Sequence, residues 1–313
     1  MEKRQELASV EAIRDGFAEL GYICSESIAT AVFLAARLRK PILVEGPPGV
    51  GKTELAKTAA TLLALPLLRL QCYEGLDEAK ALYEWKYGKQ LLYTQVLKEK
   101  LGDLLQGAEG LAESMERLHS FGDVFYSEAF LEPRPLLQAM EAEAGTVLLI
   151  DEIDKSDHEF ESLLLEILSD FQVSIPEIGT IRARSTPLVF LTSNSTRDVS
   201  DALKRRCLHL HIPFPSIELE ERILESRVPE LDARLRHQLV SFVHSVRELD
   251  LKKQPAISES IDWARSLLLL HAAELDEHWV KSTLNVLLKF ELDIETTHSE
   301  LPALLREARS DPS

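Results

Sequence analysis

The sequence predicts an α/β fold, an αβα sandwich built on a parallel sheet, followed by an all-α region. Three observations predict it. The glycine-rich segment 46–53 stands between an apolar run and a helix-compatible stretch, the context that a phosphate-binding loop needs. A second apolar run, 146–150, is typical of a strand buried on both faces of a parallel sheet. From about residue 216 onward only helical patterns occur.

The helices and strands follow from apolar spacing and from proline. Two helices are expected over 1–24 and 25–40, the second with an apolar stripe at helical spacing. Residues 74–120 are predicted to be mostly helical, with breaks at 101–103 and 106–107. Strands are expected to begin at Pro41 and to cover 65–72, 146–150, 187–191 and 208–212.

This pattern predicts two domains. Strands that alternate with helices over residues 1–215 indicate a nucleotide-binding αβα domain. Residues 216–313 are expected to form a separate helical domain.

Composition narrows the classes of function. The chain has 313 residues, 45% of them hydrophobic and 28% charged, which is typical of a globular protein. Its net charge of −17 repels nucleic acid phosphates, so we expect no nucleic acid partner. No apolar run approaches the roughly 20 residues that span a bilayer, and the charged N-terminus does not resemble a secretory signal. The three cysteines are far apart without CxxC spacing, which predicts a reducing, cytoplasmic location and no zinc site.

The phosphate-binding loop predicts a site for a nucleoside triphosphate and Mg²⁺. ATP is the expected nucleotide, although the loop contacts phosphates and not the base, so it does not exclude guanine. Its glycines allow backbone N–H groups to surround phosphate oxygens, and the helix that follows adds its positive dipole end. Lys52 is expected to reach the β- and γ-phosphates, and the Thr53 hydroxyl to ligate Mg²⁺. The predicted binding residues here are Gly46, Pro47, Pro48, Gly49, Val50, Gly51, Lys52, Thr53 and Glu54.

An acidic pair at the end of the run 147–150 predicts the second half of this site. Ligands of open α/β sheets bind at the carboxyl ends of strands, where Asp151 and Glu152 emerge. Asp151 is expected to hold Mg²⁺, and Glu152 to act as the general base that polarises the attacking water. Asp154 could belong to the site or cap a helix that begins near Ser156.

Two further segments are candidates for catalytic roles. Asn194 follows the run 187–191 and could position the attacking water, although asparagine is also common in turns. Residues 201–207 predict the end of a helix that enters a strand. Arg205 or Arg206 there could reach the γ-phosphate of a neighbouring subunit, or could simply stabilise the negative helix terminus.

Together these motifs resemble the AAA+ ATPases, and within them the MoxR family. The similarity is strongest to the branch associated with von Willebrand factor A proteins, which includes the carbon monoxide dehydrogenase accessory ATPases. Beyond the phosphate loop and the acidic pair, the segments that carry the resemblance are Gln71-Cys72-Tyr73-Glu74-Gly75, Ala81-Leu82-Tyr83-Glu84-Trp85, Arg134-Pro135-Leu136-Leu137-Gln138-Ala139 and Leu168-Ser169-Asp170-Phe171-Gln172.

The resemblance implies a ring, usually a homo-hexamer, of subunits with an αβα core and a helical lid domain, here residues 216–313. It also implies an insert within 74–93 and a hairpin around 172–184 that engage a protein partner. It implies that Asn194 is the first sensor and that Arg206 is the arginine finger, with Arg205 as the alternative. A second-sensor arginine expected on the lid is replaced by Ser258-Glu259-Ser260, so that role is either absent or passes to Arg265. Residues 98–132 match no simple pattern, and an insertion for a partner is one interpretation of them.

The predicted function is a ring-forming, Mg²⁺-dependent ATPase that remodels or matures a protein target with a von Willebrand factor A partner. An alternative is an ATP-gated binding switch in which hydrolysis is a slow resetting step. A nucleic-acid motor fits the acidic composition less well.

Overall fold

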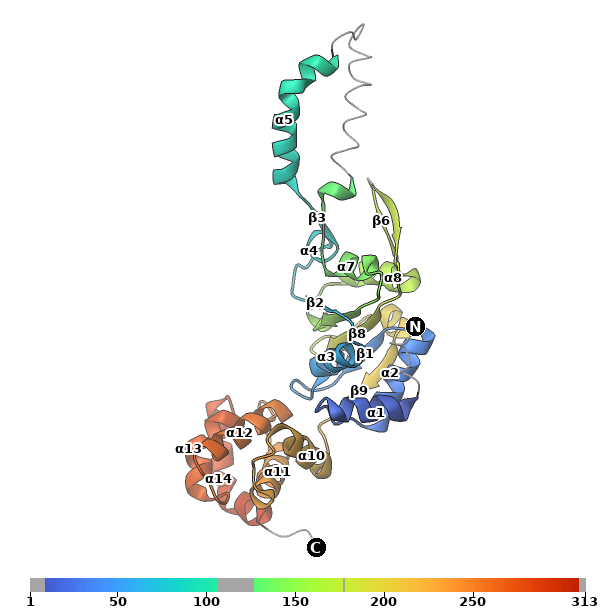
Figure 1. Ribbon diagram of the computed structural model, residues 1–313. Helices are drawn as coiled ribbons and strands as arrows, with labels where there is room; N and C mark the ends of the chain where they lie inside the picture. The colour runs from blue at the N-terminus through green and yellow to red at the C-terminus, as the bar shows by residue number, and fades with distance from the viewer. Residues whose placement is uncertain (1–8, 106–126, 177, 310–313) are drawn as a thin grey trace.

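The computed structural model describes residues 9–105, 127–176 and 178–309 (Figure 1). Its centre is a five-stranded sheet in the order β2-β5-β8-β1-β9, with every neighbouring pair parallel. This order places β1, β8 and β5 side by side, so their carboxyl ends meet at one edge of the sheet. The strands are β1 (Ile42–Glu45), β2 (Leu67–Gln71), β5 (Val147–Asp151), β8 (Leu188–Ser193) and β9 (Leu208–His211).

Helices cover both faces of this sheet because successive residues of its buried strands point to opposite sides. Ile42 and Val44 join the core beneath one set of helices, and Leu43 between them joins the core on the other face. The first face is covered by α1 (Val10–Glu19), α2 (Glu26–Leu38) and α3 (Lys52–Leu62). The second is covered by α7 (Pro135–Glu141) and α8 (His158–Asp170).

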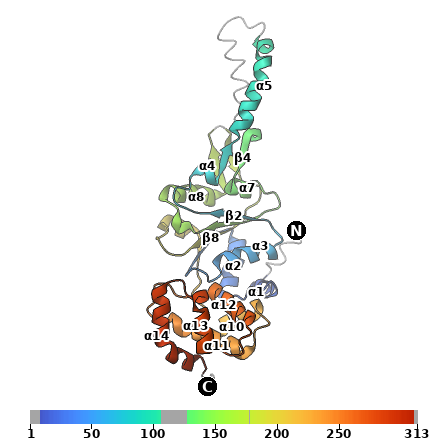
Figure 2. The same ribbon diagram turned by 90° about the vertical axis from the view of Figure 1, so that its left-hand side faces the viewer.

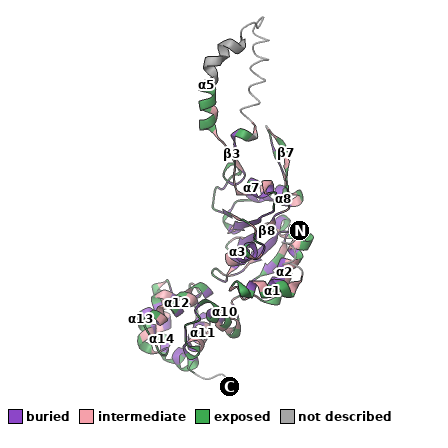
Figure 3. Cartoon of the chain, viewed as in Figure 1, coloured by how far each residue is buried: buried purple, intermediate pink, exposed green. Residues whose placement is uncertain are grey.

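The predicted fold class and all five predicted strands are confirmed, with ends that differ by one or two residues. The two predicted N-terminal helices are confirmed as α1 and α2, while residues 1–8 lie outside the described part of the chain. Burial explains this agreement: all five residues of β5 are buried, as expected of a strand that begins with a continuous apolar run. In Figure 3 the central sheet around β8 is likewise coloured as buried.

The described part of the segment 74–120 is mostly helical, as predicted, but it also contains a strand that was not predicted. A short helix, α4 (Glu78–Ala81), is followed by β3 (Tyr83–Trp85), which pairs antiparallel with β4 (Leu131–Pro133) after the 3₁₀ turn η2 (Glu128–Phe130). The half-buried rings of Tyr83 and Trp85 meet edge to face at 5.8 Å. Such a long-range strand pair leaves little signal in a three-residue segment.

The predicted helix break at 101–103 is wrong, because α5 (Tyr87–Leu105) continues through Gly102. A single glycine inside a helix costs only about 1 kcal/mol, so it need not end one. The break predicted at 106–107, and most of the stretch 98–132, lie outside the described residues.

One end of the molecule carries two projections. The predicted hairpin is confirmed as β6 (Gln172–Ile175) and β7 (Gly179–Arg182), with residue 177 not described. It points the same way as α5, from the end of the molecule opposite the C-terminal helices (Figures 1 and 2). The insert and the hairpin therefore lie on one side of the nucleotide-binding sheet.

The region after β9 is all helical and has its own core, in which Trp263 is fully buried. The boundary predicted between residues 215 and 216 stays a prediction; the first helix of this region begins at Ile217. Among the described helices, none combines the length and the apolar character that a bilayer crossing requires. The helices of this region are α10 (Ile217–Arg227), α11 (Ala233–Arg247), α12 (Ile257–Leu269), α13 (Glu277–Leu287) and α14 (Glu291–Ala308). One more helix, α9 (Asp201–Arg206), lies just before β9.

Candidate nucleotide-binding site

The phosphate-binding loop joins the end of β1 to the start of α3. Gly46 has φ +152°, and a Cβ on it would lie 2.1 Å from the backbone oxygen of Ile212, so only glycine fits. Gly51 has φ +94° and precedes α3 without any side-chain cap. The first N–H groups of α3 are therefore open to an anion, as a phosphate site requires.

The Lys52 side chain is buried and crosses the site. Its Nζ donates to the backbone oxygens of Gly46 at 2.6 Å and Pro47 at 2.7 Å, and to Oδ1 of Asn194 at 2.8 Å. Burial lowers the pKa of Lys52 to about 8, although the carboxylates of Asp154, Asp151 and Glu152 oppose this shift. The structure thus brings the predicted phosphate ligand and the predicted first sensor into direct contact.

Asp151 ends β5 as a buried carboxylate. Its Oδ1 accepts hydrogen bonds from the Thr192 hydroxyl at 2.5 Å and from the Thr53 hydroxyl at 3.1 Å. Its Oδ2 accepts from Arg69, whose Nη2 lies at 2.6 Å and Nε at 3.0 Å. The predicted metal ligands Thr53 and Asp151 are therefore adjacent, although 98 residues separate them in sequence.

Glu152 holds an unusual backbone conformation. Its φ of +59° lies in the left-handed region, which costs a non-glycine residue about 1 kcal/mol or more and is often found at functional sites. Its backbone N–H donates to the Thr192 hydroxyl. Its carboxylate accepts from Gln71 Nε2 at 2.7 Å and from Lys155 Nζ at 2.6 Å, with Asn194 Nδ2 at 3.4 Å. The predicted base thus faces the predicted first sensor.

Asp154 does not cap α8, so that alternative is wrong. Asp157 caps the helix by accepting from the N–H of Phe160. The Asp154 carboxylate instead accepts from the N–H of Asn194 and from both the N–H and the hydroxyl of Thr196. Burial alone would raise the pKa of Asp154, but these hydrogen bonds outweigh it and lower the pKa. Asp154 therefore fixes the loop that carries Asn194.

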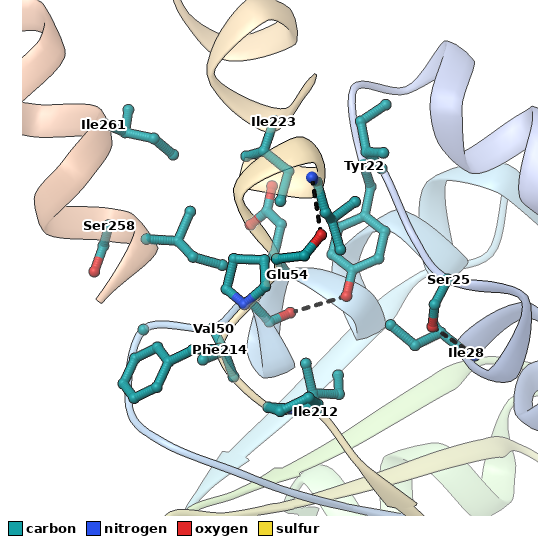
Figure 4. A pocket seen from close by; sticks show the side chains of 18 of the residues that line it. Tyr22, Ser25, Ile28, Val50, Glu54, Ile212, Phe214, Ile223, Ser258 and Ile261 are labelled. Carbon is teal, nitrogen blue, oxygen red and sulfur yellow. Dashed lines mark hydrogen bonds between the residues drawn. The ribbon is translucent and has the colours of Figure 1, made fainter. Parts of the chain in front are cut away.

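An apolar cavity of about 430 Å³ lies beside the phosphate loop (Figure 4). The turn between α1 and α2 contributes Tyr22, the segment after β9 contributes Ile212 and Phe214, and the start of α12 contributes Ser258 and Ile261. A concave, mainly apolar site with a few polar groups suits a flat aromatic ligand next to bound phosphates. The loop residues Gly49, Val50 and Gly51 and the predicted Glu54 also line it.

The nucleotide-binding part of the chain matches a known family. Residues 41–207, from just before β1 to the end of α9, match the family model of the AAA domain (dynein-related subfamily). The chain belongs to this AAA family. The matched range includes the phosphate-binding loop, the acidic pair, Asn194 and both candidate arginines.

Two relatives of the AAA protein are uncharacterized bacterial proteins. One, from Staphylococcus aureus (strain bovine RF122 / ET3-1), is 27% identical over 238 residues, covering 74% of this chain and 76% of its own. Another, from Staphylococcus epidermidis (strain ATCC 12228 / FDA PCI 1200), is 26% identical over 239 residues, covering 74% and 77%.

Among solved structures, the chain is similar to the Thermotoga maritima RuvB Holliday junction branch migration motor. The two are 18% identical with a TM-score of 0.46, and the match covers 92% of this chain and 76% of that one. A point mutant of the same RuvB protein matches at 17% identity with a TM-score of 0.46, covering 97% and 79%.

The remaining predicted residues of the AAA protein lie away from the loop. Arg205 and Arg206 end α9 and are both exposed. Across residues 9–105, 127–176 and 178–309, neither guanidinium has an ion pair or hydrogen bond. Arg265 lies on the exposed side of α12, 3.9 Å from Asp262, and is not among the residues that line the cavity. Their roles stay predictions.

The donors of the AAA site fit a nucleotide-bound Mg²⁺. Within the described residues no group of three or more His, Cys, Asp or Glu side chains could hold a metal ion unaided. Mg²⁺ prefers oxygen ligands and usually takes one or two from protein, with waters and phosphate oxygens completing its shell. The adjacent Thr53 hydroxyl and buried Asp151 carboxylate are such a set.

Two contributors to the site were not predicted from sequence. Arg69 and Gln71 lie on β2, where Gln71 is in register with Asp151, and both point toward the acidic pair. The available signal was the alternate polar spacing of Arg69 and Gln71 at the end of an otherwise apolar run. The cavity residues Tyr22 and Phe214 were also missed, since they come from segments nearly 200 residues apart.

Proposed function

We propose that this AAA protein is a Mg²⁺-dependent ATPase. One observation carries the proposal: Lys52 of the phosphate loop contacts Asn194, directly after β8, and Thr53 contacts Asp151 at the end of β5. Three separate segments thereby converge on one point beside a cavity that suits a nucleobase. In-line hydrolysis needs a phosphate cradle, a metal site and a base, and this convergence supplies candidates for each.

Each residue has a proposed part in the reaction. The loop N–H groups and the Lys52 ammonium would hold the β- and γ-phosphates, while Glu152 would accept the proton of the attacking water. Asn194, which lies between Lys52 and Glu152, would orient that water. Thr53 and Asp151 would hold Mg²⁺, which supplies charge stabilisation to the phosphate oxygens when bound.

We further propose that the protein forms a ring, most simply a homo-hexamer, in which Arg206 completes the site of the next subunit. The exposure of the α9 end supports this, since a guanidinium without a partner in the described part of its own chain is available to another. Arg205 is the alternative, because adjacent helical residues point about 100° apart and only one can face the neighbour.

The proposed target is a protein, remodelled or matured with a von Willebrand factor A domain partner as in the MoxR family. Support comes from the segments quoted for that family and from the projecting α5, which exposes the large apolar side chains Tyr87, Leu91, Leu92, Tyr93 and Val96. Exposed apolar groups of this size commonly mark protein contacts. The charge of −17 disfavours nucleic acid, and a cytoplasmic location remains part of this proposal.

Glu152→Gln tests the assignment. Removing the base should reduce ATP hydrolysis by about 10²–10⁴-fold, whereas binding of ATP, measured by calorimetry, should stay within a few-fold. Glu159→Gln is the matched control, because Glu159 is exposed on α8 and outside the site. Near-normal hydrolysis by Glu152→Gln would refute the proposed mechanism.

A slower, switch-like function is the second candidate. Lys155 and Gln71 both donate to the Glu152 carboxylate, and these hydrogen bonds would compete with a water for its oxygens. If ATP acts mainly as a gate, partner binding should survive in Glu152→Gln and disappear in Lys52→Ala. Loss of partner binding in both variants would favour coupling to turnover.

A further inference from the structure

We propose that Arg69 competes with Mg²⁺ for the Asp151 carboxylate and thereby sets how much magnesium the protein needs to bind ATP. This inference rests on the proposed nucleotide site. It concerns a residue of β2 that lies outside the phosphate loop and the acidic pair.

The Asp151 carboxylate already accepts a full set of hydrogen bonds. A carboxylate offers about four acceptor positions, two on each oxygen. Oδ1 accepts from the hydroxyls of Thr192 and Thr53, and Oδ2 accepts from Nη2 and Nε of Arg69, with the same Thr53 hydroxyl also within 3.3 Å of Oδ2. All four positions are in use. Mg²⁺ held at this carboxylate, directly or through its waters, would need at least one of these positions, so one present donor would have to leave.

Within the described part of the chain, three side chains donate to Asp151, and they differ in how freely they can move away from it. Thr192 is buried and also accepts the N–H of Glu152, so its position is fixed. Thr53 stands at the start of α3 and is itself a proposed metal ligand. The Arg69 side chain is 51% exposed, against 3% for Asp151, and it is long and flexible. Arg69 is therefore the donor that can move into solvent.

The positive charge of Arg69 also opposes a cation at Asp151. Arg69 is the one basic side chain that forms an ion pair with Asp151 within residues 9–105, 127–176 and 178–309. A guanidinium at 2.6 Å from Oδ2 is within a few ångströms of any cation that shares the carboxylate, and like charges at that range repel strongly near a protein surface. The Arg69–Asp151 ion pair therefore lowers the affinity for Mg²⁺, and bound Mg²⁺ weakens the ion pair by the same factor.

The Arg69 guanidinium also connects the metal ligand to the proposed base. Nη2 of Arg69 donates to Oε1 of Gln71, whose Nε2 donates to Glu152.

The test is a magnesium titration of nucleotide binding by the 313-residue protein. Binding of a fluorescent, non-hydrolysable ATP analogue is measured at matched free Mg²⁺ for wild type, Arg69→Met, Arg69→Lys and Arg184→Met. Arg184 is an exposed arginine paired with Glu143 far from the site, so its removal controls for the loss of a surface charge. Comparing proteins at the same free Mg²⁺ cancels chelation by the nucleotide in solution.

Arg69→Met should lower the Mg²⁺ concentration for half-maximal binding by about five- to tenfold, and Arg184→Met should leave it unchanged. Arg69→Lys keeps the charge but loses the fork, so it should fall between wild type and Arg69→Met. If Arg69→Met does not fold, Arg69→Lys provides the test. A Mg²⁺ concentration for half-maximal binding below that of the wild type supports competition, and one at or above the wild-type value overturns it.

A half-saturation that is unchanged or raised in Arg69→Met would show that Arg69 merely positions Asp151, and would overturn the inference. Failure of the wild type to bind the analogue at any Mg²⁺ concentration would overturn the proposed nucleotide site and this inference with it. Binding without hydrolysis would contradict the ATPase alone, and the titration would still test Arg69.

Discussion

The ammonium of Lys52 donates a hydrogen bond of 2.8 Å to Oδ1 of Asn194, joining the phosphate loop to the end of β8 across 142 residues of sequence. The other end of the same amide, Nδ2, lies 3.4 Å from Glu152. One side chain therefore touches both the proposed phosphate ligand and the proposed base.

Asn194→Ala should separate these two functions. We expect hydrolysis to fall by about 10- to 100-fold, because the water would lose a positioning group, while ATP affinity changes by no more than a few-fold. Steady-state kinetics and calorimetry measure the two effects. Asn285→Ala, an exposed asparagine on α13, is the control. A loss confined to ATP affinity would instead make Asn194 an anchor for Lys52.

Arg206→Ala should abolish turnover without removing ATP binding, if α9 supplies a residue to the neighbouring subunit. A loss of at least roughly 100-fold is expected, since such arginines contribute roughly 10³–10⁵. Arg205→Ala is the matched comparison, one residue away and equally exposed.

Mixing tests the in-trans geometry directly. Arg206→Ala subunits keep an intact loop, and Lys52→Ala subunits keep the arginine, so a mixture of the two inactive proteins should regain hydrolysis. Sizing with and without ATP and Mg²⁺ should show an oligomer. A mixture that stays inactive, or a strict monomer, would remove the proposed finger.

The predictable part of this protein is the part encoded locally. The loop 46–53 and the runs that become β5 and β8 carry their own signals, because glycine tolerates positive φ and strands buried on both faces must be apolar. The adjacency of Thr53 and Asp151 then follows from strand order in a doubly wound sheet.

The unpredicted part depends on contacts between distant segments. Arg69 points at Asp151 only because β2 lies beside β5 in one register, which a five-residue strand does not reveal. Tyr22 and Phe214 line one cavity because the segments that precede α2 and α10 both lie beside the phosphate loop, and β3 exists because it pairs with β4 across the insert. Tertiary context of this kind overrides local propensity.

Gly49→Ala should uncouple the phosphate loop from the helical region. Gly49 has φ +78°, and a Cβ there would lie 2.5 Å from the Cβ of Ala256 and 2.7 Å from Oγ of Ser258, at the start of α12. The clash should push α12 off the loop and open the cavity. We expect ATP affinity to fall by about tenfold or more, which corresponds to about 1.4 kcal/mol.

Gly75→Ala is a close control for this change. Gly75 also has φ +78°, but nothing lies within 4 Å of a Cβ built on it. Both variants bear the same cost of about 1–2 kcal/mol for alanine in the left-handed region, so only the contact with α12 differs. Thermal melts and ATP titrations compare them. Equal effects in the two variants would mean that backbone strain, and not the contact with α12, accounts for the loss.

The helical region contains a buried ion pair between Glu220 and Arg247. In the wild type the Glu220 carboxylate stabilises the fold at higher pH, and without Arg247 it should destabilise the fold most at higher pH. Glu220 on α10 is fully buried and accepts from Arg247 at 2.6 and 2.9 Å, from His244 at 3.0 Å and from Ser260 at 2.7 Å. Burial would raise the pKa of Glu220, but the bonds from His244 and Arg247 hold it below the usual value of 4.5. In the wild type this carboxylate therefore stabilises the fold above pH 4.5, and the contribution is lost as pH falls below it.

Arg247→Met leaves that carboxylate buried without its main counter-charge. The free energy of unfolding should fall by about 3–5 kcal/mol at about pH 8. Burial then dominates, so the folded protein binds a proton more readily than the unfolded chain, and the deficit should shrink as pH falls toward about 5.5. His244 is the other titratable group that faces Glu220. Urea unfolding at both pH values measures the deficit, with the exposed Arg306→Met on α14 as the control. An equal deficit at both pH values would show that Arg247 acts by packing against Phe214, whose ring lies 4.8 Å away, and not through charge.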